Sequence, residues 1–163
     1  MKICTEGVLV LASAKKLADE YKNREFDYDF PGGLSNLLEQ NSIIALMTSD
    51  GDDIILEINK TGEKLIGDFD KVITQWIELK TDDEILILSH AEFTQICSKK
   101  GDYKNYGWPI KKISGMEAGV YKIKFGIEDF RDNFDEIEGY FRLTVSILKT
   151  ENAEPNGVDE IAL

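Results

Sequence analysis

The feature that most constrains the fold is an aliphatic strand pattern that leads directly into a helical pattern, and it occurs twice. Residues 8–23 are VLVLASAKKLADEYKN, and residues 85–100 are ILILSHAEFTQICSKK. In each segment a run of apolar residues, typical of a buried strand, precedes apolar residues at helical spacing. Ser13 is a candidate helix N-cap, and Ser89 with Glu92 three residues later predicts a capping box. The sequence therefore predicts two strand–helix units.

An aromatic phrase that ends in proline follows each predicted helix. YDFP occupies residues 28–31 and YGWP occupies residues 106–109, at nearly the same distance from the preceding strand. This order predicts a pseudo-repeat of strand, helix, aromatic-proline turn and hairpin, with units 1–80 and 81–150. Two short elements in the same order also arise by chance, so the repeat is one of two interpretations.

The remaining apolar runs predict strands. Residues 43–60, IIALMTSDGDDIILEINK, predict a hairpin that turns through Asp50, Gly51 and Asp52. Residues 119–125 and 139–149 predict two further strands joined by an acidic loop. We therefore expect an α+β fold, mainly antiparallel sheet with two principal helices.

The domain organisation follows from the absence of a linker. No stretch rich in proline, glycine or serine divides residues 1–150, so we expect a single domain whose two units share one sheet system. Residues 151–163, ENAEPNGVDEIAL, combine acids, proline and glycine without periodicity. They predict a flexible acidic tail.

The charge limits the class of partner. The chain has 31 acidic and 19 basic residues and a formal net charge of −12. This charge opposes binding to nucleic acid and to anionic membranes and favours a cationic partner. The alternative is that the acidity only keeps the protein in solution. The apolar runs are too short to cross a bilayer and the N-terminus does not resemble a signal peptide, which together predict a cytoplasmic protein.

The sequence contains no recognisable catalytic motif. His90 is the only histidine, at the predicted start of a helix, and no nucleophile elbow, phosphate loop or zinc-binding helix motif is present. Two acidic pairs, Asp27 with Asp29 and Asp50 with Asp52, have the spacing to share a hard cation, but aspartate is also the residue that turns require. We expect a protein that is not an enzyme and that has no cofactor and no metal site.

The candidate partner-binding residues form two groups. One is the acidic segment GIEDFRDNFDEIEG at residues 126–139, and the other is the second aromatic phrase. In the acidic segment Phe130, Phe134 and Ile137 either cover the core or act as exposed apolar anchors within an acidic rim. The aromatic rings either seal a loop onto the sheet or contact a partner. The predicted partner-binding residues are Tyr106, Trp108, Glu128, Asp129, Asp132, Asp135, Glu136 and Glu138.

Several of these segments together resemble the small acidic immunity proteins of bacterial polymorphic toxin systems. The segments are the early strand GVLVLAS, the turn DYDFP, and the late strands GVYKIKF and GYFRLTVSI. The resemblance implies a cytoplasmic inhibitor that neutralises a cognate toxin, often a nuclease, by occluding its active site or an adjacent surface. It assigns no individual binding residue.

A second function class is also compatible with the sequence. Two related units can enclose a cleft, and the aromatic phrases would line it with Tyr28, Phe30, Tyr106 and Trp108. The chain would then be a non-enzymatic module that binds a small molecule or regulates another process.

Overall fold

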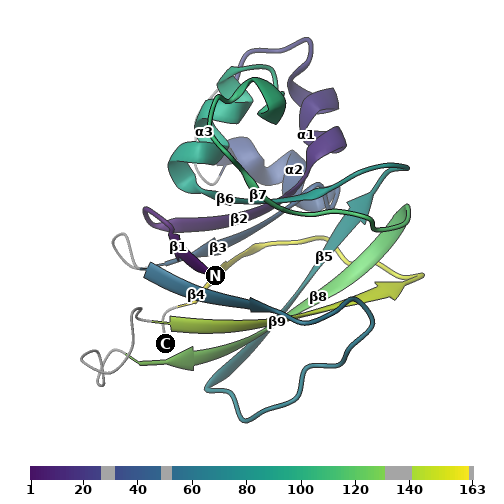
Figure 1. Ribbon diagram of the computed structural model, residues 1–163. Helices are drawn as coiled ribbons and strands as arrows, with labels where there is room; N and C mark the ends of the chain where they lie inside the picture. The colour runs from purple at the N-terminus through teal and green to yellow at the C-terminus, as the bar shows by residue number, and fades with distance from the viewer. Residues whose placement is uncertain (27–31, 49–52, 131–140, 162–163) are drawn as a thin grey trace.

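The computed structural model describes residues 1–26, 32–48, 53–130 and 141–161. Two five-stranded sheets stack face to face, and the helices cover the outer side of one of them (Figure 1). The predicted fold class, α+β with mainly antiparallel strands, is confirmed. No helix in the described part of the chain is long and apolar enough to cross a membrane.

Ten strands, three α-helices and two short 3-10 helices account for the regular structure of the described residues. The strands are β1 (Lys2–Cys4), β2 (Val8–Ser13), β3 (Ile43–Met47), β4 (Asp53–Ile58), β5 (Lys71–Leu79), β6 (Ile85–Ser89), β7 (Lys111–Ile113), β8 (Gly119–Asp129), β9 (Phe141–Thr150) and β10 (Val158–Glu160). The helices are α1 (Ala14–Tyr21), α2 (Ser35–Glu39) and α3 (His90–Ser98), with the 3-10 helices η1 (Gly32–Leu34) and η2 (Tyr103–Asn105).

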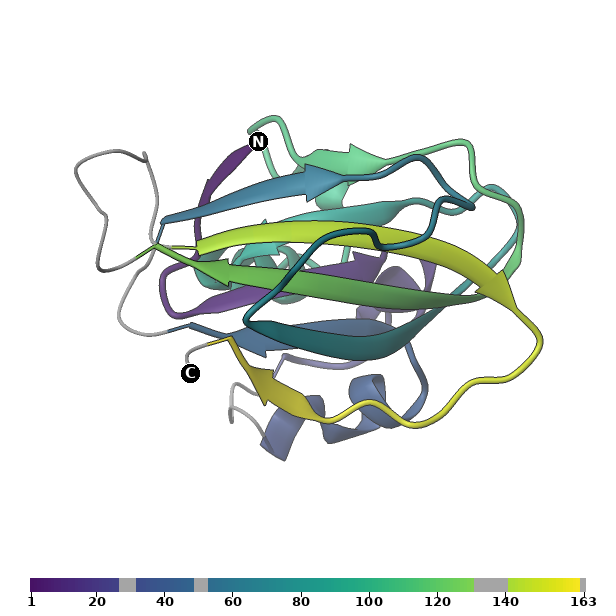
Figure 2. The same cartoon turned by 90° about the horizontal axis from the view of Figure 1, so that it is seen from below.

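The two sheets differ in what covers them. Sheet A has the strand order β1-β4-β9-β8-β5, and sheet B has the order β10-β3-β2-β6-β7. Neighbouring strands of the described chain are antiparallel except for the pairs β4 with β9 and β10 with β3. Helices cover the outer face of sheet B, whereas the connection from β4 to β5 runs across the outer face of sheet A (Figure 2).

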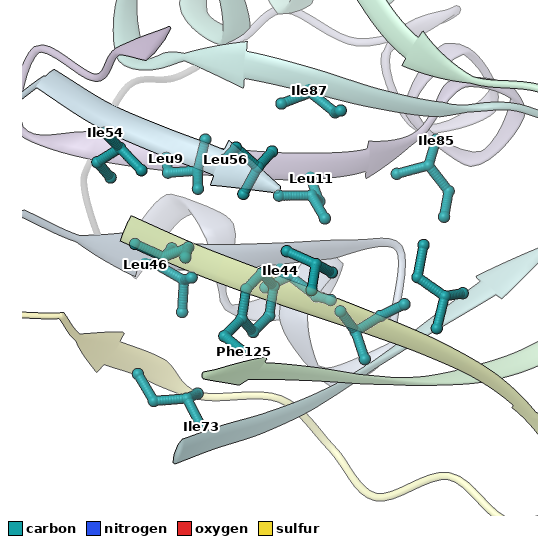
Figure 3. Packing of buried hydrophobic residues seen from close by; sticks show 14 of the residues in the cluster. Leu9, Leu11, Ile44, Leu46, Ile54, Leu56, Ile73, Ile85, Ile87 and Phe125 are labelled. Carbon is teal, nitrogen blue, oxygen red and sulfur yellow. The ribbon is translucent and has the colours of Figure 1, made fainter. Parts of the chain in front are cut away.

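This burial explains the aliphatic runs in the sequence. Every residue of β2 and β6 is buried, because sheet B has the helices on one face and sheet A on the other. Between the sheets, Leu9 and Leu11 of sheet B lie in one core with Leu56 and Phe125 of sheet A (Figure 3). The opposite face of sheet B packs against helix residues that include Leu17. A strand covered on both faces has no polar alternation, as is typical of buried strands.

Both predicted helix starts are confirmed. The Ser13 hydroxyl accepts a hydrogen bond from the Lys16 amide at the start of α1. At the start of α3, the Ser89 hydroxyl accepts from the Glu92 amide while the Glu92 carboxylate accepts from the Ser89 amide, which completes a capping box. These contacts satisfy backbone groups that have no partner within the helix.

The predicted hairpin at residues 43–60 is wrong. β3 belongs to sheet B, where it pairs with β2 and β10, whereas β4 belongs to sheet A, where it pairs with β1 and β9. The predicted turn residues lie outside the described residues. Two adjacent strands separated by turn residues are compatible with a hairpin or with a change of sheet, and the sequence pattern does not distinguish them.

The elements follow the same order in both halves of the chain. In the order β1-β2-α1-β3-β4, the first and last strands belong to sheet A and the two strands beside the helix belong to sheet B. The order β5-β6-α3-β7-β8 has the same arrangement. In this order β5 (Lys71–Leu79) is the first strand of the second half, whereas the predicted units 1–80 and 81–150 place it in the first.

The C-terminal segment differs from the expected flexible tail. Val158–Glu160 form β10 at the edge of sheet B, and Asn156 and Ile161 are buried. The residues before Asn156 are exposed, so the polar composition at 151–155 describes only the connection to this strand.

Candidate functional sites

Four of the eight predicted partner-binding residues can be placed in the structure. Tyr106 and Trp108 lie between η2 and β7, and Glu128 and Asp129 end strand β8. The predicted residues Asp132, Asp135, Glu136 and Glu138 lie outside the described residues, as do the aromatic residues Tyr28 and Phe30.

Trp108 is more exposed than Tyr106, the other predicted aromatic contact among the described residues. Its side chain is 74% exposed, in a segment where Gly107 and Pro109 are also exposed. An indole exposed to water to this extent does not seal a loop onto the sheet, which was one of the two roles predicted for the aromatic rings.

Tyr106 has a structural role. It packs partly buried against the core between sheet B and the helices, and the Lys99 ammonium lies 5.7 Å from the centre of its ring. Burial raises the pKa of the Tyr106 hydroxyl, and the carboxylates of Glu92 and Glu6 raise it further. Tyr106 therefore fixes the segment that presents Trp108.

Glu128 and Asp129 lie within a small network of charges at the end of sheet A. Arg142 on β9 forms ion pairs with Glu128, at 3.8 Å, and with Glu57, at 3.5 Å. The Arg142 guanidinium also lies 5.1 Å from the centre of the Phe130 ring. The Asp129 amide donates to the Asp70 carboxylate at 2.9 Å. The Glu128 charge is thus partly compensated within the fold.

The two groups occupy the same end of the molecule but different sheets. β8 ends, β9 begins, β3 ends and β4 begins at the end of the sandwich where β6 runs into α3 (Figure 1). The strand that follows Trp108 contacts β1, since the Lys111 ammonium donates to the Lys2 carbonyl at 3.0 Å. β8 lies three strand positions from β1, about 14 Å at the usual spacing. We call this end of the molecule the β8 end.

Acidic side chains are frequent at the β8 end. Exposed or half-exposed carboxylates there include Glu6, Asp70, Glu128, Asp129 and Glu160. Glu6 accepts a hydrogen bond from the Ala91 amide at the start of α3. Lys71 and Arg142 lie at the same end, so carboxylates and cationic side chains are interspersed there.

A pocket of about 690 Å³ lies at the opposite end of the sandwich. Four segments that are distant in sequence form it: the turn before β6, the start of α1, the loop after α3 and the end of β7 with the loop beyond. No pattern in the sequence predicted this pocket. Its lining residues are Ala14, Lys15, Ala18, Asp82, Asp83, Glu84, Gly101, Asp102, Tyr103, Lys104, Lys112, Gly115 and Met116.

Glu84 joins three of the pocket segments. Its carboxylate accepts hydrogen bonds from the Tyr103 hydroxyl, from the Lys112 ammonium at 3.0 Å and from the Ser114 hydroxyl at 2.6 Å. These donors, Ser114 first, lower the pKa of Glu84 to about 2, so its carboxylate is charged at neutral pH.

Asp83 joins the pocket turn to α1. The buried carboxylate accepts from the Ser13 hydroxyl at 2.6 Å and from the amides of Lys15, Lys80 and Glu84. Its hydrogen-bonding capacity is therefore used within the fold.

The described part of the chain contains no cluster of metal-binding side chains. No set of three or more histidine, cysteine, aspartate or glutamate residues among those residues could hold a metal ion. His90 and Cys97 lie at opposite ends of α3, so they do not form a cysteine–histidine pair. Burial also raises the pKa of the Cys97 thiol, which disfavours the reactive thiolate. The acidic pairs Asp27 with Asp29 and Asp50 with Asp52 lie outside the described residues.

Comparison with known proteins identifies a shared fold. No protein-family model and no curated protein matches the chain. The solved structure "Crocagin biosynthetic gene J" has a TM-score of 0.52 and 9% sequence identity, over 90% of this chain and 94% of that chain. ComJ from Bacillus subtilis, described as an inhibitor of the DNA-degrading activity of NucA, has a TM-score of 0.44 and 9% identity, over 91% of this chain and 92% of that chain. The first similarity shows a common fold and the second is too low to support an argument.

Proposed function

We propose that the chain is an immunity-type protein that binds and neutralises a cognate, basic, nuclease-like toxin in the cytoplasm. It acts without catalysis and without a cofactor. The observation that carries the proposal is Trp108, which is 74% exposed at the end of the sandwich that also presents Glu128 and Asp129. Tryptophan is enriched among the residues that contribute most of the binding energy at protein interfaces.

The dimensions of this surface suit a single interface. A typical stable complex buries about 800 Å² on each partner. β1, which the strand after Trp108 contacts, lies about 14 Å from β8 within sheet A, so one interface of this size can include both groups. Trp108 would supply an apolar anchor, and the carboxylates would form a polar rim and accelerate association with a basic surface. A nuclease must bind a polyanion, so its basic groove is a natural target for an acidic inhibitor.

The primary test has two stages. The purified chain is used to capture binding proteins from lysate of its source organism at low and high salt, and each captured protein is then purified and assayed for nuclease activity with and without the chain. We expect one basic nuclease that the chain inhibits. Capture of no nuclease, or of a nuclease whose activity the chain leaves unchanged, would overturn the proposal.

Substitution of Trp108 tests the anchor. Loss of a central tryptophan at an interface raises the dissociation constant by about a hundredfold. We expect this from Trp108→Ala, with thermal stability unchanged because the side chain is exposed. Ile66→Ala is the matched control, since Ile66 is 85% exposed on the connection that crosses sheet A. An equal loss of affinity in both variants would contradict a specific contact at Trp108.

Neutralisation of the acidic segment tests the electrostatic contribution. The variant Asp132→Asn, Asp135→Asn, Glu136→Gln is compared with the control variant Glu39→Gln, Glu151→Gln, Glu154→Gln, whose three residues are exposed on other parts of the surface. We expect the first variant to slow association and to reduce its dependence on salt, because surface charges act mainly on the association rate. Unchanged rates at low salt would exclude this part of the proposal.

A second candidate function is a small-molecule-binding module. The pocket supports it, because its walls come from α1 in the first half of the chain and from the loops after α3 and β7 in the second half. The lining differs from the one predicted: Tyr103 lines the pocket, whereas Tyr106 and Trp108 do not.

A further inference from the structure

We infer that this pocket binds a zwitterionic ligand of the amino-acid or short-peptide class, with its ammonium group at Asp82 and its carboxylate at Lys104. The inference rests on the second candidate function and is independent of toxin binding, because the pocket and Trp108 lie at opposite ends of the sandwich. The volume of about 690 Å³ lies within the usual range for small-molecule sites, about 300 to 1,000 Å³.

The pocket is preformed. Glu84 holds η2, β7 and the residue after β7 together, and Asp83 holds the turn before β6 against α1. The loop after α3 approaches α1 closely at Gly101, where an added Cβ would lie 2.5 Å from the Leu17 carbonyl oxygen. Walls fixed in this way reduce the conformational entropy that the protein loses when a ligand binds.

Most charged groups of the lining are already used within the fold. The Lys112 ammonium pairs with Glu84, and the Lys15 ammonium donates to the Thr81 carbonyl at 2.6 Å. The Asp102 carboxylate accepts from the Lys104 amide at 3.0 Å and from the Asn105 side chain at 2.6 Å. Such groups shape the pocket but have limited capacity for a ligand.

Two lining groups of opposite charge have no such partner. Among the described residues, no hydrogen bond or ion pair involves the Asp82 carboxylate or the Lys104 ammonium. They lie on different walls, since Asp82 belongs to the turn before β6 and Lys104 belongs to η2. A ligand with one positive and one negative end complements both groups.

The rest of the lining favours this class over a simple ion. Four carboxylates in the wall repel an anion, and three lysines repel a cation. A zwitterion has no net charge, and each of its ends can lie beside a lining group of opposite charge. Ala14, Ala18 and Met116 offer apolar contacts for a side chain of the ligand. The Tyr103 ring is fixed by its hydroxyl bond to Glu84 and by the Lys112 ammonium, 5.5 Å from the ring centre.

The test uses three matched peptides and the full chain. Leucyl-leucine carries both end charges, N-acetyl-leucyl-leucine lacks the ammonium, and leucyl-leucinamide lacks the carboxylate. Binding is measured by titration calorimetry, and stabilisation is measured as a shift in Tm. We expect leucyl-leucine to bind and to raise the Tm, and each capped peptide to bind about threefold more weakly, the effect of one partly exposed ion pair.

Two variants assign the ends of the ligand. Asp82→Asn should weaken leucyl-leucine about threefold and leave N-acetyl-leucyl-leucine unchanged, and Lys104→Gln should weaken leucyl-leucine similarly and leave leucyl-leucinamide unchanged. Asn tolerates the left-handed backbone at Asp82, where φ is 55°. Lys64→Gln, on the connection across sheet A, is the control.

The outcomes distinguish failure of the zwitterionic ligand class from failure of the second candidate function. Equal binding of all three peptides, or equal effects of the pocket and control variants, would overturn the zwitterionic class. If only uncharged or singly charged metabolites raise the Tm, the ligand class is wrong and the second candidate function stands. If no small molecule raises the Tm, both fail, and toxin inhibition is judged by its own assay.

Discussion

At the scale of single residues, Asn156 connects the two sheets on the side where β5 is the edge strand. Its side-chain amide donates to the carbonyls of Ile43 on β3, at 2.8 Å, and Trp76 on β5, at 2.6 Å. Its side-chain oxygen accepts from the Trp76 amide at 2.8 Å. A single asparagine thus satisfies backbone groups from both sheets, where an edge strand would otherwise leave them unpaired.

We predict that Asn156→Ala lowers the free energy of unfolding by about 3 kcal/mol, because it leaves buried backbone groups of Ile43 and Trp76 without partners. Chemical denaturation measures the effect. Asn152→Ala, at an exposed position in the same segment, is the control and should change the unfolding free energy by less than about 0.5 kcal/mol. Similar values for the two variants would contradict the role of Asn156 as a connection between the sheets.

Gly101 is a second residue whose identity the structure explains. Its φ is +71°, and an added Cβ would meet Leu17 and Ala18 backbone atoms at 2.5 to 2.8 Å. Gly115 has a similar φ, +78°, but an added Cβ there would meet nothing within 4 Å. An alanine at Gly115 would therefore introduce backbone strain alone, whereas an alanine at Gly101 would introduce backbone strain and steric overlap.

We predict that Gly115→Ala costs about 1 kcal/mol through backbone strain alone, and that Gly101→Ala costs about 2 kcal/mol more because α1 must move away from the loop. The unfolding free energies of the two variants are compared by denaturation. Equal losses would show that α1 and the loop after α3 are not in the close contact described.

At the scale of secondary-structure elements, Glu84 holds together segments that no strand pairing connects. Its carboxylate is the acceptor for Tyr103 on η2, Lys112 on β7 and Ser114 beyond β7. The pKa of Glu84 is lowered to about 2 from an ordinary value of 4.5. A carboxylate with a lowered pKa in the folded state stabilises the fold above its unfolded pKa, and this stabilisation is lost as pH falls towards the folded value.

We therefore predict that the stability difference between the natural protein and Glu84→Gln is largest above pH 5 and narrows between pH 4.5 and pH 2. Denaturation at pH 6 and at pH 3 measures it. Glu39→Gln, at an exposed position on α2, is the control variant. A difference that is the same at both pH values would contradict the contribution of the charged carboxylate.

The sequence predicts local elements better than their partners. Strand β2, helix α1 and its Ser13 cap, and the capping box of α3 follow from patterns within a few residues, and all are confirmed. The hairpin at residues 43–60 failed because strand pairing depends on contacts far along the chain. β4 pairs in parallel with β9, from Ile54 with Phe141 onwards, and no local signal specifies that choice.

The candidate sites show the same limit. Tyr106 and Trp108 have similar aromatic character in the sequence, and only the packing of Tyr106 against the helix-side core leaves Trp108 as the exposed ring. The pocket was missed because its walls come from four separate segments. The consecutive acids Asp82, Asp83 and Glu84 were a signal, but one that a solvated turn gives equally well.

At the scale of the whole molecule, the C-terminal segment closes one side of the sandwich. β10 adds to the edge of sheet B (Figure 2). Hydrogen bonds connect β10 and the residue before it to strand β5 of sheet A. The Gln75 amide on β5 donates to the Asp159 carboxylate, and the Lys71 ammonium donates to the Glu160 carbonyl at 2.7 Å. Ile161 is fully buried in the core between the sheets. The segment thus covers β5, the edge strand of sheet A, and β3, which would be the edge strand of sheet B without β10.

Removal of residues 151–163 should therefore destabilise the entire fold. Burial of Ile161 contributes about 2 kcal/mol and the Asn156 bonds about 3 kcal/mol, together a large part of the 5 to 15 kcal/mol typical of a domain. We expect the truncated chain to unfold at least about 10 °C below the full chain and to aggregate through its uncovered strand edges, as measured by calorimetry and light scattering. Glu151→Ser with Glu154→Ser, at exposed positions before Asn156, is the control and should retain the Tm of the full chain. A truncated chain with an unchanged Tm would support the flexible tail expected from composition and would contradict the structural role of β10.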